Sequence, residues 1–400
     1  MFGRVLLFAT LLMAMLAPAA LAQDNGNPTI AFLRYAGTAP VTEATKGLLD
    51  SLEAYGYLTS AERAALNESY DLEGENLNLL YRDAGFDLPS VNLMVEEVLD
   101  KGADVLITVT TQVAQIAVNA TRDMDDPPAI LFSLVTTPFS TGIADAPCVK
   151  PDHVTGTQPL MSFADYVPLV MVQNPDIKVI GTIVSPDQPT SLLGAEIITG
   201  IAESLGLTVE VASAVTPADL NVAAESLLGK GVEAIVLVIN PLTLQGTPVL
   251  VQLTAEYGVP LYAPIIQQVY RGATVGAGFH SFYQEGVIAA RILNAYLSGD
   301  IGIADIAINQ SRSFGVAINL DTAAAQGLEI SGDLLAMANF LIQDGERSTG
   351  LAADVDNTAT NPQAMSAEER RAADLEFLAG LECTPERIAE EQAALDAASE

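Results

Sequence analysis

Polar side chains gather in short loops that directly follow the apolar, strand-like segments of this chain. These loops carry hydroxyl and amide groups, as in Thr110-Thr-Gln112, Thr136-Thr-Pro138 and Asn240-Pro-Leu-Thr243. Such groups suit hydrogen bonding around a small solute, and a tyrosine such as Tyr35 could stack on a flat one. The residue types therefore predict a binding site rather than a catalytic one.

Catalytic and metal-binding patterns find little support. His153 and His280 are the only histidines, which disfavours histidine-rich metal sites and most histidine-based nucleophile triads. The sequence contains no GxxxxGK[S/T] loop, no GxGxxG after the first strand and no CxxC pair. We expect no enzyme activity, no cofactor and no metal site.

Strand-like and helix-like segments alternate along the chain, and this alternation positions the polar loops. A first series of apolar strands is expected at 29–33, 105–109 and 129–135, and a second at 178–184, 208–212, 234–239 and from 259. Continuous apolar runs separated by helices are typical of parallel strands buried on both faces. The restart after the first series predicts two α/β lobes. Ligands in such sheets sit where loops converge at the carboxyl ends of the strands.

The N-terminus has the features of a cleavable secretory signal. Arg4 precedes an apolar run from Val5 to Ala17, and Ala20-Leu-Ala22 is a small-x-small cleavage site. The alternative is a retained anchor, but the run is short for a bilayer span. We expect residues 1–22 to be a signal peptide and the mature chain to be free in the periplasm.

The charge balance excludes several partners. The 17 basic and 50 acidic residues give a net charge of −33, which argues against nucleic acid and anionic membrane surfaces. Half of the chain is hydrophobic, as in a well-buried soluble protein, and we expect a monomer.

In an oxidising compartment the two cysteines, Cys148 and Cys383, form a plausible disulfide. The alternative is two separate thiols, because spacing alone does not show that their Cα atoms come close.

Several short motifs, in order, resemble those of a known family. The chain is similar to the substrate-binding proteins of ABC transporters whose relatives take up aromatic amino acids. The resemblance runs from about Thr29 to Ile330. It is carried by six segments that correspond, in this order, to the family motifs T-P-A-A-Q, V-T-D-P, V-T-G, N-P, R-G-A and G-V-D-Y-Y-x-L-G. These segments are Thr111-Gln-Val-Ala-Gln115, Val135-Thr-Thr-Pro138, Val154-Thr-Gly156, Ser185-Pro186, Arg271-Gly-Ala273 and Gly278 to Gly286.

The resemblance implies the type I periplasmic-binding fold, in which two doubly wound parallel-sheet lobes are joined by a three-segment hinge. We expect residues 28–146 and 271–302 to form the N-lobe and residues 151–269 and 303–330 to form the C-lobe. The hinge would then lie near 147–151, 269–271 and 302–303. Residues 331–400 would be a linker and a helical C-terminal extension, with helices at 366–379 and 385–398 after a polar run at 344–362.

The predicted ligand-binding residues come from the strand-end loops and the matched motifs. They are Arg34, Tyr35, Thr38, Thr111, Gln112, Thr136, Thr137, Gln158, Pro186, Asp187, Asn240, Gln267 and His280.

The charge of the ligand is the most open part of this prediction. Where the family often has aspartates to meet an α-ammonium, this chain has Thr137, Asn240 and Ile265. A buried ammonium needs an acceptor, so either Asp187 supplies it or the solute is not an ordinary amino acid. Arg34 could bind a carboxylate in the cleft. Alternatively, Arg34 is a rim residue paired with a neighbouring acid.

Three functions remain open at the level of sequence. The first is capture of a small organic solute, amino-acid-like or an aromatic carboxylate, for the permease of an ABC importer. The second is ligand sensing for a membrane receptor with the same cleft. The third, a periplasmic enzyme, is disfavoured by the missing catalytic patterns.

Overall fold

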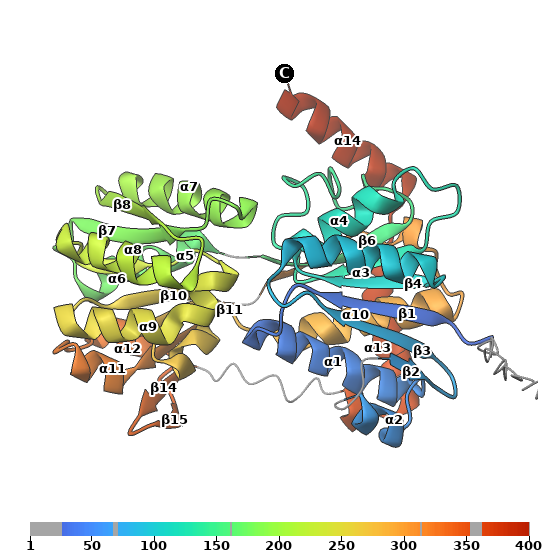
Figure 1. Ribbon diagram of the computed structural model, residues 1–400, viewed down its shortest axis with the longest axis horizontal. Coiled ribbons are helices and arrows are strands. Elements are labelled where there is room, and N and C mark those ends of the chain that lie inside the picture. Colours follow the sequence, from blue (N-terminus) through green and yellow to red (C-terminus); the bar gives the residue numbers. More distant parts are fainter. Residues whose placement is uncertain (1–25, 67–70, 161, 313, 353–361, 400) are drawn as a thin grey trace, which may run out of the picture.

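The computed structural model describes residues 26–66, 71–160, 162–312, 314–352 and 362–399. Two α/β lobes lie side by side, each with a mainly parallel sheet flanked by helices (Figure 1). The predicted fold class of two doubly wound lobes is therefore confirmed. The signal peptide expected over residues 1–22 lies outside the described residues.

The N-lobe is built on a seven-stranded sheet in the order β12-β6-β5-β4-β1-β3-β2. All neighbours pair in parallel except β2, which is antiparallel to β3. Central strands such as β4 and β5 are buried at every position, which explains why their sequences are apolar except for Thr108 and Ser133. The strands are β1 (Thr29–Arg34), β2 (Asp71–Glu73), β3 (Asn78–Asp83), β4 (Val105–Val109), β5 (Ala129–Ser133), β6 (Val154–Leu160) and β12 (Asn309–Arg312).

Helices cover both faces of this sheet. On one face lie α1 (Ala39–Tyr55) and α10 (Phe282–Leu297), and on the other lie α3 (Leu88–Asp100) and α4 (Thr111–Thr121). The short α2 (Ser60–Ala65) follows α1 and begins with a capping box at Thr59. A short 3₁₀ helix, η2 (Ile303–Asp305), precedes β12.

Two glycines allow α1 and α10 to pack in direct backbone contact. A Cβ at Gly286 would stand 1.9 Å from the carbonyl oxygen of Ala44, and one at Gly47 would stand 2.0 Å from that of Tyr283. No side chain fits at either position without moving a helix. This contact fixes α10, which belongs to a late segment of the chain, against the N-terminal helix.

The C-lobe has an eight-stranded sheet in the order β15-β14-β13-β11-β10-β9-β7-β8. Its pairs are parallel except β11 with β13 and β14 with β15. The strands are β7 (Val179–Val184), β8 (Thr208–Ser213), β9 (Ala234–Val236), β10 (Leu261–Ile265), β11 (Val275–Phe279), β13 (Gly315–Asn319), β14 (Phe340–Gln343) and β15 (Glu346–Thr349).

The C-lobe helices form two separate apolar cores with the sheet. The helices are α5 (Phe163–Tyr166), α6 (Leu169–Gln173), α7 (Pro189–Ser204), α8 (Pro217–Gly229), α9 (Pro241–Tyr257), the 3₁₀ helix η1 (Ile266–Arg271), α11 (Leu320–Ala325) and α12 (Gly332–Met337).

The sheets divide the chain at different points from the expected boundaries. Strand β6, expected in the C-lobe, pairs with β5 of the N-lobe, and β12 pairs with β6. Strand β11, expected in the N-lobe, pairs with β10 and β13 of the C-lobe. The chain therefore crosses between lobes after β6, after β11 and after β12, not near 147–151, 269–271 and 302–303. The reason is that each of these strands is held by hydrogen bonds to the lobe it leaves, and strand pairing is not visible in a sequence.

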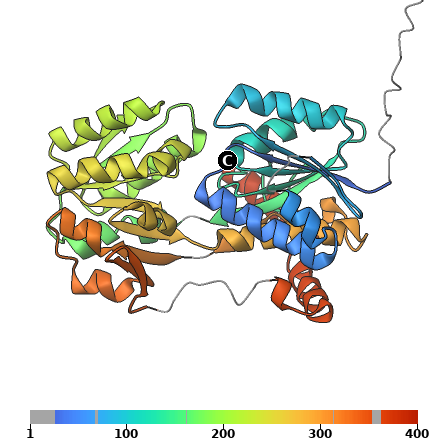
Figure 2. The same ribbon diagram turned by 60° about the horizontal axis from the view of Figure 1, so that its bottom comes forward.

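The region expected as linker and extension is shared between the lobes. The β14–β15 hairpin completes the C-lobe sheet and α12 packs in the C-lobe core, so residues 332–349 belong to that lobe. After a short 3₁₀ helix, η4 (Pro362–Ala364), helix α13 (Ala367–Ala379) packs against the N-lobe, and α14 (Pro385–Ser399) projects outward from the same lobe (Figures 1 and 2). The predicted disulfide between Cys148 and Cys383 is present, with Cα atoms 5.5 Å apart, and it fixes this extension beside β12.

Candidate ligand-binding site

A pocket of about 80 Å³ lies between the two lobes, at the carboxyl ends of their strands. Both lobes contribute to its walls, and none of the lining residues is charged at neutral pH. They are Tyr35, Ala36, Thr38, Pro40, Val41, Thr110, Thr111, Gln112, Leu134, Thr136, Pro159 and Phe282 from the N-lobe, and Thr190, Ile239, Pro241, Leu244 and Ile265 from the C-lobe.

Five helices begin at this pocket: α1, α4, α7, α9 and α10 each place a residue of the first turn or the N-cap in its lining. Thr38 and Thr110 occupy the N-cap positions of α1 and α4, and neither makes a capping side-chain hydrogen bond. Helix N-termini present backbone N–H groups and a partial positive charge. The pocket therefore combines apolar walls with a field that favours an anionic or hydrogen-bond-accepting group.

Two lining residues have a strained backbone. Thr110, after β4, has a φ of 83°, and Leu134, after β5, has a φ of 56°. Branched side chains rarely adopt such values, and strain of this kind concentrates at ligand sites. The strain turns the chain at the ends of two adjacent strands, so that both residues line the pocket.

Direct contacts join the lobes around the pocket. The amide Nε2 of Gln112 on α4 contacts Oε1 of Gln188 at the start of α7. Leu244 and Ile265 of the C-lobe pack in the same apolar cluster as Val41 and Phe282 of the N-lobe. These contacts show that the structure has the lobes closed around the pocket.

A polar contact lies behind the pocket. Gln267 Nε2 on η1 donates to Glu43 Oε2 on α1 at 3.4 Å and to the carbonyl oxygen of His280 at 3.1 Å. Burial raises the pKa of the Glu43 carboxyl to about 7, although the Gln267 amide and Lys46 act in the opposite direction. This carboxyl is thus a titratable group at the junction of the lobes.

The chain matches a known family over most of its length. Residues 43–342 match the family described as ABC transporter substrate binding protein. This protein belongs to that family. The prediction made from the short motifs is confirmed.

Individual relatives share less than a quarter of their aligned residues with this chain. A protein named tyrosine-binding protein from Clostridioides difficile (strain R20291) is 23% identical over 290 residues, which cover 72% of this chain and 77% of that protein. A crystal structure of a conserved domain protein from Vibrio cholerae has a TM-score of 0.69 at 23% identity, over 79% of this chain and 99% of that one. An ABC domain from Streptococcus pneumonia in complex with L-Trp also has a TM-score of 0.69, at 21% identity, over 79% of this chain and 100% of that one. These structures share the fold.

Five of the residues predicted from sequence lie in the pocket lining: Tyr35, Thr38, Thr111, Gln112 and Thr136. Tyr35 donates its hydroxyl to the carbonyl oxygen of Phe86 at 2.9 Å, and burial raises its pKa. Its ring is therefore fixed as part of the wall.

Gln158, Thr137, Pro186 and Asp187 lie beside the lining rather than in it. Gln158 donates to the carbonyl oxygen of Thr136 at 3.0 Å and accepts from Gln310 at 2.8 Å, so its amide is used within the N-lobe. Pro186 and Asp187 are exposed just before α7. Asp187 Oδ2 accepts from Gln188 Nε2 at 3.2 Å.

Asn240 has a structural role that the sequence prediction did not include. It is fully buried, its Oδ1 accepts from the backbone N–H of Leu242 at 2.7 Å, and its Nδ2 donates to Ser185 Oγ at 2.6 Å. The side chain caps α9 and ties it to the end of β7. Its neighbours Ile239 and Pro241 line the pocket in its place.

Gln267 and His280 lie behind the pocket. Gln267 lines a smaller adjoining hollow and makes the contacts to Glu43 and His280 described above. Burial lowers the pKa of His280, which favours its neutral form.

Arg34 forms an ion pair with a neighbouring acidic residue, the second of the two alternatives considered for it. Its Nε lies 2.5 Å from Asp83 Oδ2, and its guanidinium lies over the ring of Tyr81 at 5.0 Å. The residue is not part of the pocket lining.

Sequence reasoning missed most of the apolar lining, including Pro40, Leu134, Pro159, Ile265 and Phe282. Leu134 lies two positions before Thr136, and Pro159 follows Gln158 on β6, so apolar residues close to the predicted polar ones were the available signal. In the described ranges, no helix is long and apolar enough to cross a membrane. Over the same ranges, no group of three or more His, Cys, Asp or Glu gathers in a way that could hold a metal ion.

Proposed function

We propose that this protein captures a small organic solute in the interlobe pocket and delivers it to the permease of an ABC importer. The observation that carries the proposal is a pocket walled by both lobes, so that lobe closure encloses the solute. Membership of the family supports the transport role. A secreted, periplasmic and monomeric protein would fit this role.

The chemistry of the lining favours a solute with an aromatic or apolar body. Tyr35 and Phe282 offer ring faces, and Leu134, Leu244 and Ile265 offer aliphatic surface. Thr111, Gln112 and the first turns of α1 and α4 offer hydrogen-bond donors to a carboxylate. The relatives named for tyrosine binding and solved with L-Trp support an aromatic amino acid or a related acid.

An α-ammonium has fewer partners here than a carboxylate. The lining has no acidic side chain, and Asp187 stands exposed nearby. An unpaired buried ammonium is costly, so we expect aromatic acids without the amine to compete with the amino acids.

The test is a thermal-shift and calorimetry series on the mature protein. L-tyrosine, L-tryptophan and L-phenylalanine would be compared with 4-hydroxyphenylpropionate, 3-phenylpropionate and, as negative controls, tyramine and glucose. A binder raises the melting temperature by mass action. Stabilisation by the amino acids or acids is expected, and stabilisation by glucose alone would contradict the proposal.

Matched variants locate the site. Thr111→Val keeps the shape of the side chain but removes its hydroxyl, and Phe282→Ala removes a ring from the wall. We expect Thr111→Val to raise the dissociation constant of the bound acid about tenfold, equivalent to about 1.4 kcal/mol. Thr208→Val, at an exposed position on β8, is the control and should leave the dissociation constant unchanged. Arg34→Ala should change it less than threefold, because Asp83 already holds the guanidinium.

A further inference from the structure

A fully buried carboxyl group lies at the joint between the lobes. Glu285 stands in the first turn of α10, immediately after the crossing from β11, and has 0% exposure. Neither of its carboxylate oxygens has a hydrogen-bond partner of good geometry among the described residues. The ligand-binding role proposed above makes no use of this group.

The strands that lead into the crossings after β6 and β12 lie beside this side chain. The hydroxyls of Thr157 on β6 and Ser311 on β12 approach the Glu285 carboxyl. These two strands are hydrogen-bonded neighbours, and each leads directly into one of the other crossings. Ser133, at the end of β5, accompanies Thr157, with 3.4 Å between their hydroxyl oxygens. Glu285 therefore lies against two N-lobe strands, β6 and β12, each of which leads into a crossing to the C-lobe.

Among the residues that the structure describes, no positively charged side chain pairs with this carboxyl. Burial raises the pKa of Glu285 to about 7, and the Ser311 and Thr157 hydroxyls lower it only in part. The charged groups on the packed elements face elsewhere. On α1, Glu43 faces Gln267, Lys46 lies over the ring of Tyr283 at 5.6 Å, and Asp50 faces Tyr283 and Arg63. Asp374 of α13 faces Arg291, and Arg312 of β12 is exposed. An ionised carboxylate in this place would be unpaired, and an unpaired buried charge is costly unless water reaches it.

We propose that Glu285 is a proton-dependent positioning residue of the hinge. When it is neutral, the three crossings pack as in the structure and the lobes remain closed. When it is ionised, hydration of the carboxylate separates β6 and β12 from α10 and the lobes open. A solute held between the lobes is then released more readily at higher pH, a part of the proposal that rests on the function proposed above.

The direct test needs no ligand. Small-angle X-ray scattering of the mature protein at pH 5.5 and 8.5, at constant ionic strength, reports the separation of the lobes. The wild-type protein should be compact at pH 5.5 and expanded at pH 8.5. Glu285→Gln and Glu285→Leu, which cannot ionise, should be compact at both values. If both variants fold and still expand with the wild-type midpoint, the proposal is overturned.

The second carboxyl that titrates near neutrality between the lobes supplies the matched control. Glu43→Gln removes the group that contacts Gln267 but leaves Glu285 in place. It should retain the pH-dependent expansion. Loss of the expansion in Glu43→Gln together with its persistence in Glu285→Gln would assign the effect to Glu43 and would also overturn the proposal.

Binding of L-tyrosine tests the functional consequence. Its dissociation constant should rise at least threefold between pH 5.5 and 8.5 in the wild-type protein and stay constant in Glu285→Gln. If L-tyrosine binds neither protein at either pH, this ligand class is excluded, while the scattering comparison still decides the role of Glu285. A wild-type affinity that does not change with pH, despite expansion, would separate the hinge from ligand release and contradict the last step of the proposal.

Discussion

Arg291 on α10 and Asp374 on α13 form an ion pair with 3.0 Å between Nε and Oδ1, and the carboxylate is only 2% exposed. The other carboxylate oxygen of Asp374 accepts from the hydroxyl of Tyr55 on α1 at 2.7 Å. The C-terminal extension is thus held against the same two helices that pack through glycines. We expect Arg291→Ala to destabilise the protein by about 3 kcal/mol, because it leaves a buried carboxylate unpaired. Chemical denaturation would measure the loss.

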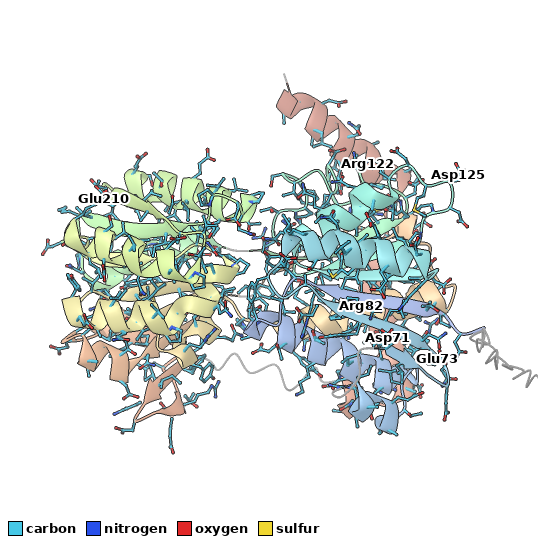
Figure 3. All side chains as sticks on the ribbon, viewed as in Figure 1. Asp71, Glu73, Arg82, Arg122, Asp125 and Glu210 are labelled. Carbon is cyan, nitrogen blue, oxygen red and sulfur yellow. A yellow bond between two sulfur atoms is a disulfide. The ribbon has the colours of Figure 1, made fainter. Side chains whose placement is uncertain are left out.

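An exposed ion pair provides the control for this prediction. Lys230 Nζ lies 2.7 Å from Glu210 Oε2 on the outer surface of the C-lobe, where Figure 3 labels Glu210. Lys230→Ala should cost less than about 1 kcal/mol, because both groups remain hydrated. Similar losses for the two variants would show that the Arg291–Asp374 pair does not hold the extension.

The Cys148–Cys383 disulfide joins segments 235 residues apart in sequence. Such a link restricts the unfolded chain, so a double Cys→Ser variant should lose about 2–4 kcal/mol of stability. A reducing agent should lower the melting temperature of the wild-type protein toward that of the variant and leave the variant unchanged. Mass spectrometry under non-reducing conditions should find no free thiols, and two free thiols would contradict the pairing.

Gly286 and Gly200 both lie inside helices, but substitution by alanine should change the stability of the protein in opposite directions at the two positions. A Cβ at Gly286 would meet the Ala44 carbonyl at 1.9 Å, whereas one at Gly200 on α7 has nothing within 4 Å. Gly286→Ala should cost about 3 kcal/mol through overpacking of α1 against α10. Gly200→Ala should stabilise by about 0.5–1 kcal/mol through helix propensity. Thermal unfolding of the two variants would check both signs, and stabilisation by both would refute the tight helix contact.

Glu43 should make the stability of the folded protein against unfolding depend on pH. Its folded pKa of about 7 lies above the ordinary value of 4.5, because burial opposes its ionisation. Because the folded pKa is raised, the contribution of Glu43 to the free energy of unfolding is fully present below about pH 4.5. This contribution is lost as the pH rises through about 7. Glu43→Gln should therefore match the wild type near pH 4.5 and exceed it by about 1–2 kcal/mol at pH 8, after allowance for solvent screening. If the free energy of unfolding of the two proteins changed with pH in parallel, Glu43 would be excluded as the source of the pH dependence.

Much of the fold could be predicted from the sequence because the signals are local. Mainly apolar runs such as those of β4 and β5 predict buried parallel strands. The edge strand β2 was missed, because its three residues are only partly buried and carry two acids. The surface around it is charged, with Arg82 between Asp71 and Glu97, and Figure 3 shows Arg82 and Asp71 close together and remote from the C-lobe.

Part of the candidate site could be predicted for the same reason. Thr111 and Thr136 follow apolar strands, and loops at the carboxyl ends of parallel strands converge. The prediction rested on the polar residues of these loops, but the wall also includes apolar residues, such as Leu134 after β5 and Pro159 on β6. Asn240 looked like a binding residue because asparagine suits both a ligand and a helix cap, and only the positions of Leu242 and Ser185 show that it caps α9.

The sequence by itself determined the local elements, the family and the two cysteines that could pair. The tertiary structure alone decided which residues meet. Arg34 and Asp83 are 49 positions apart and become direct partners because β1 and β3 pair with these two residues in register. Likewise, β6 and β11 were assigned to the wrong lobes until their hydrogen-bonded neighbours were known. The physical reason is that hydrophobic periodicity depends on the nearest residues along the chain, whereas strand pairing and burial depend on contacts between distant segments.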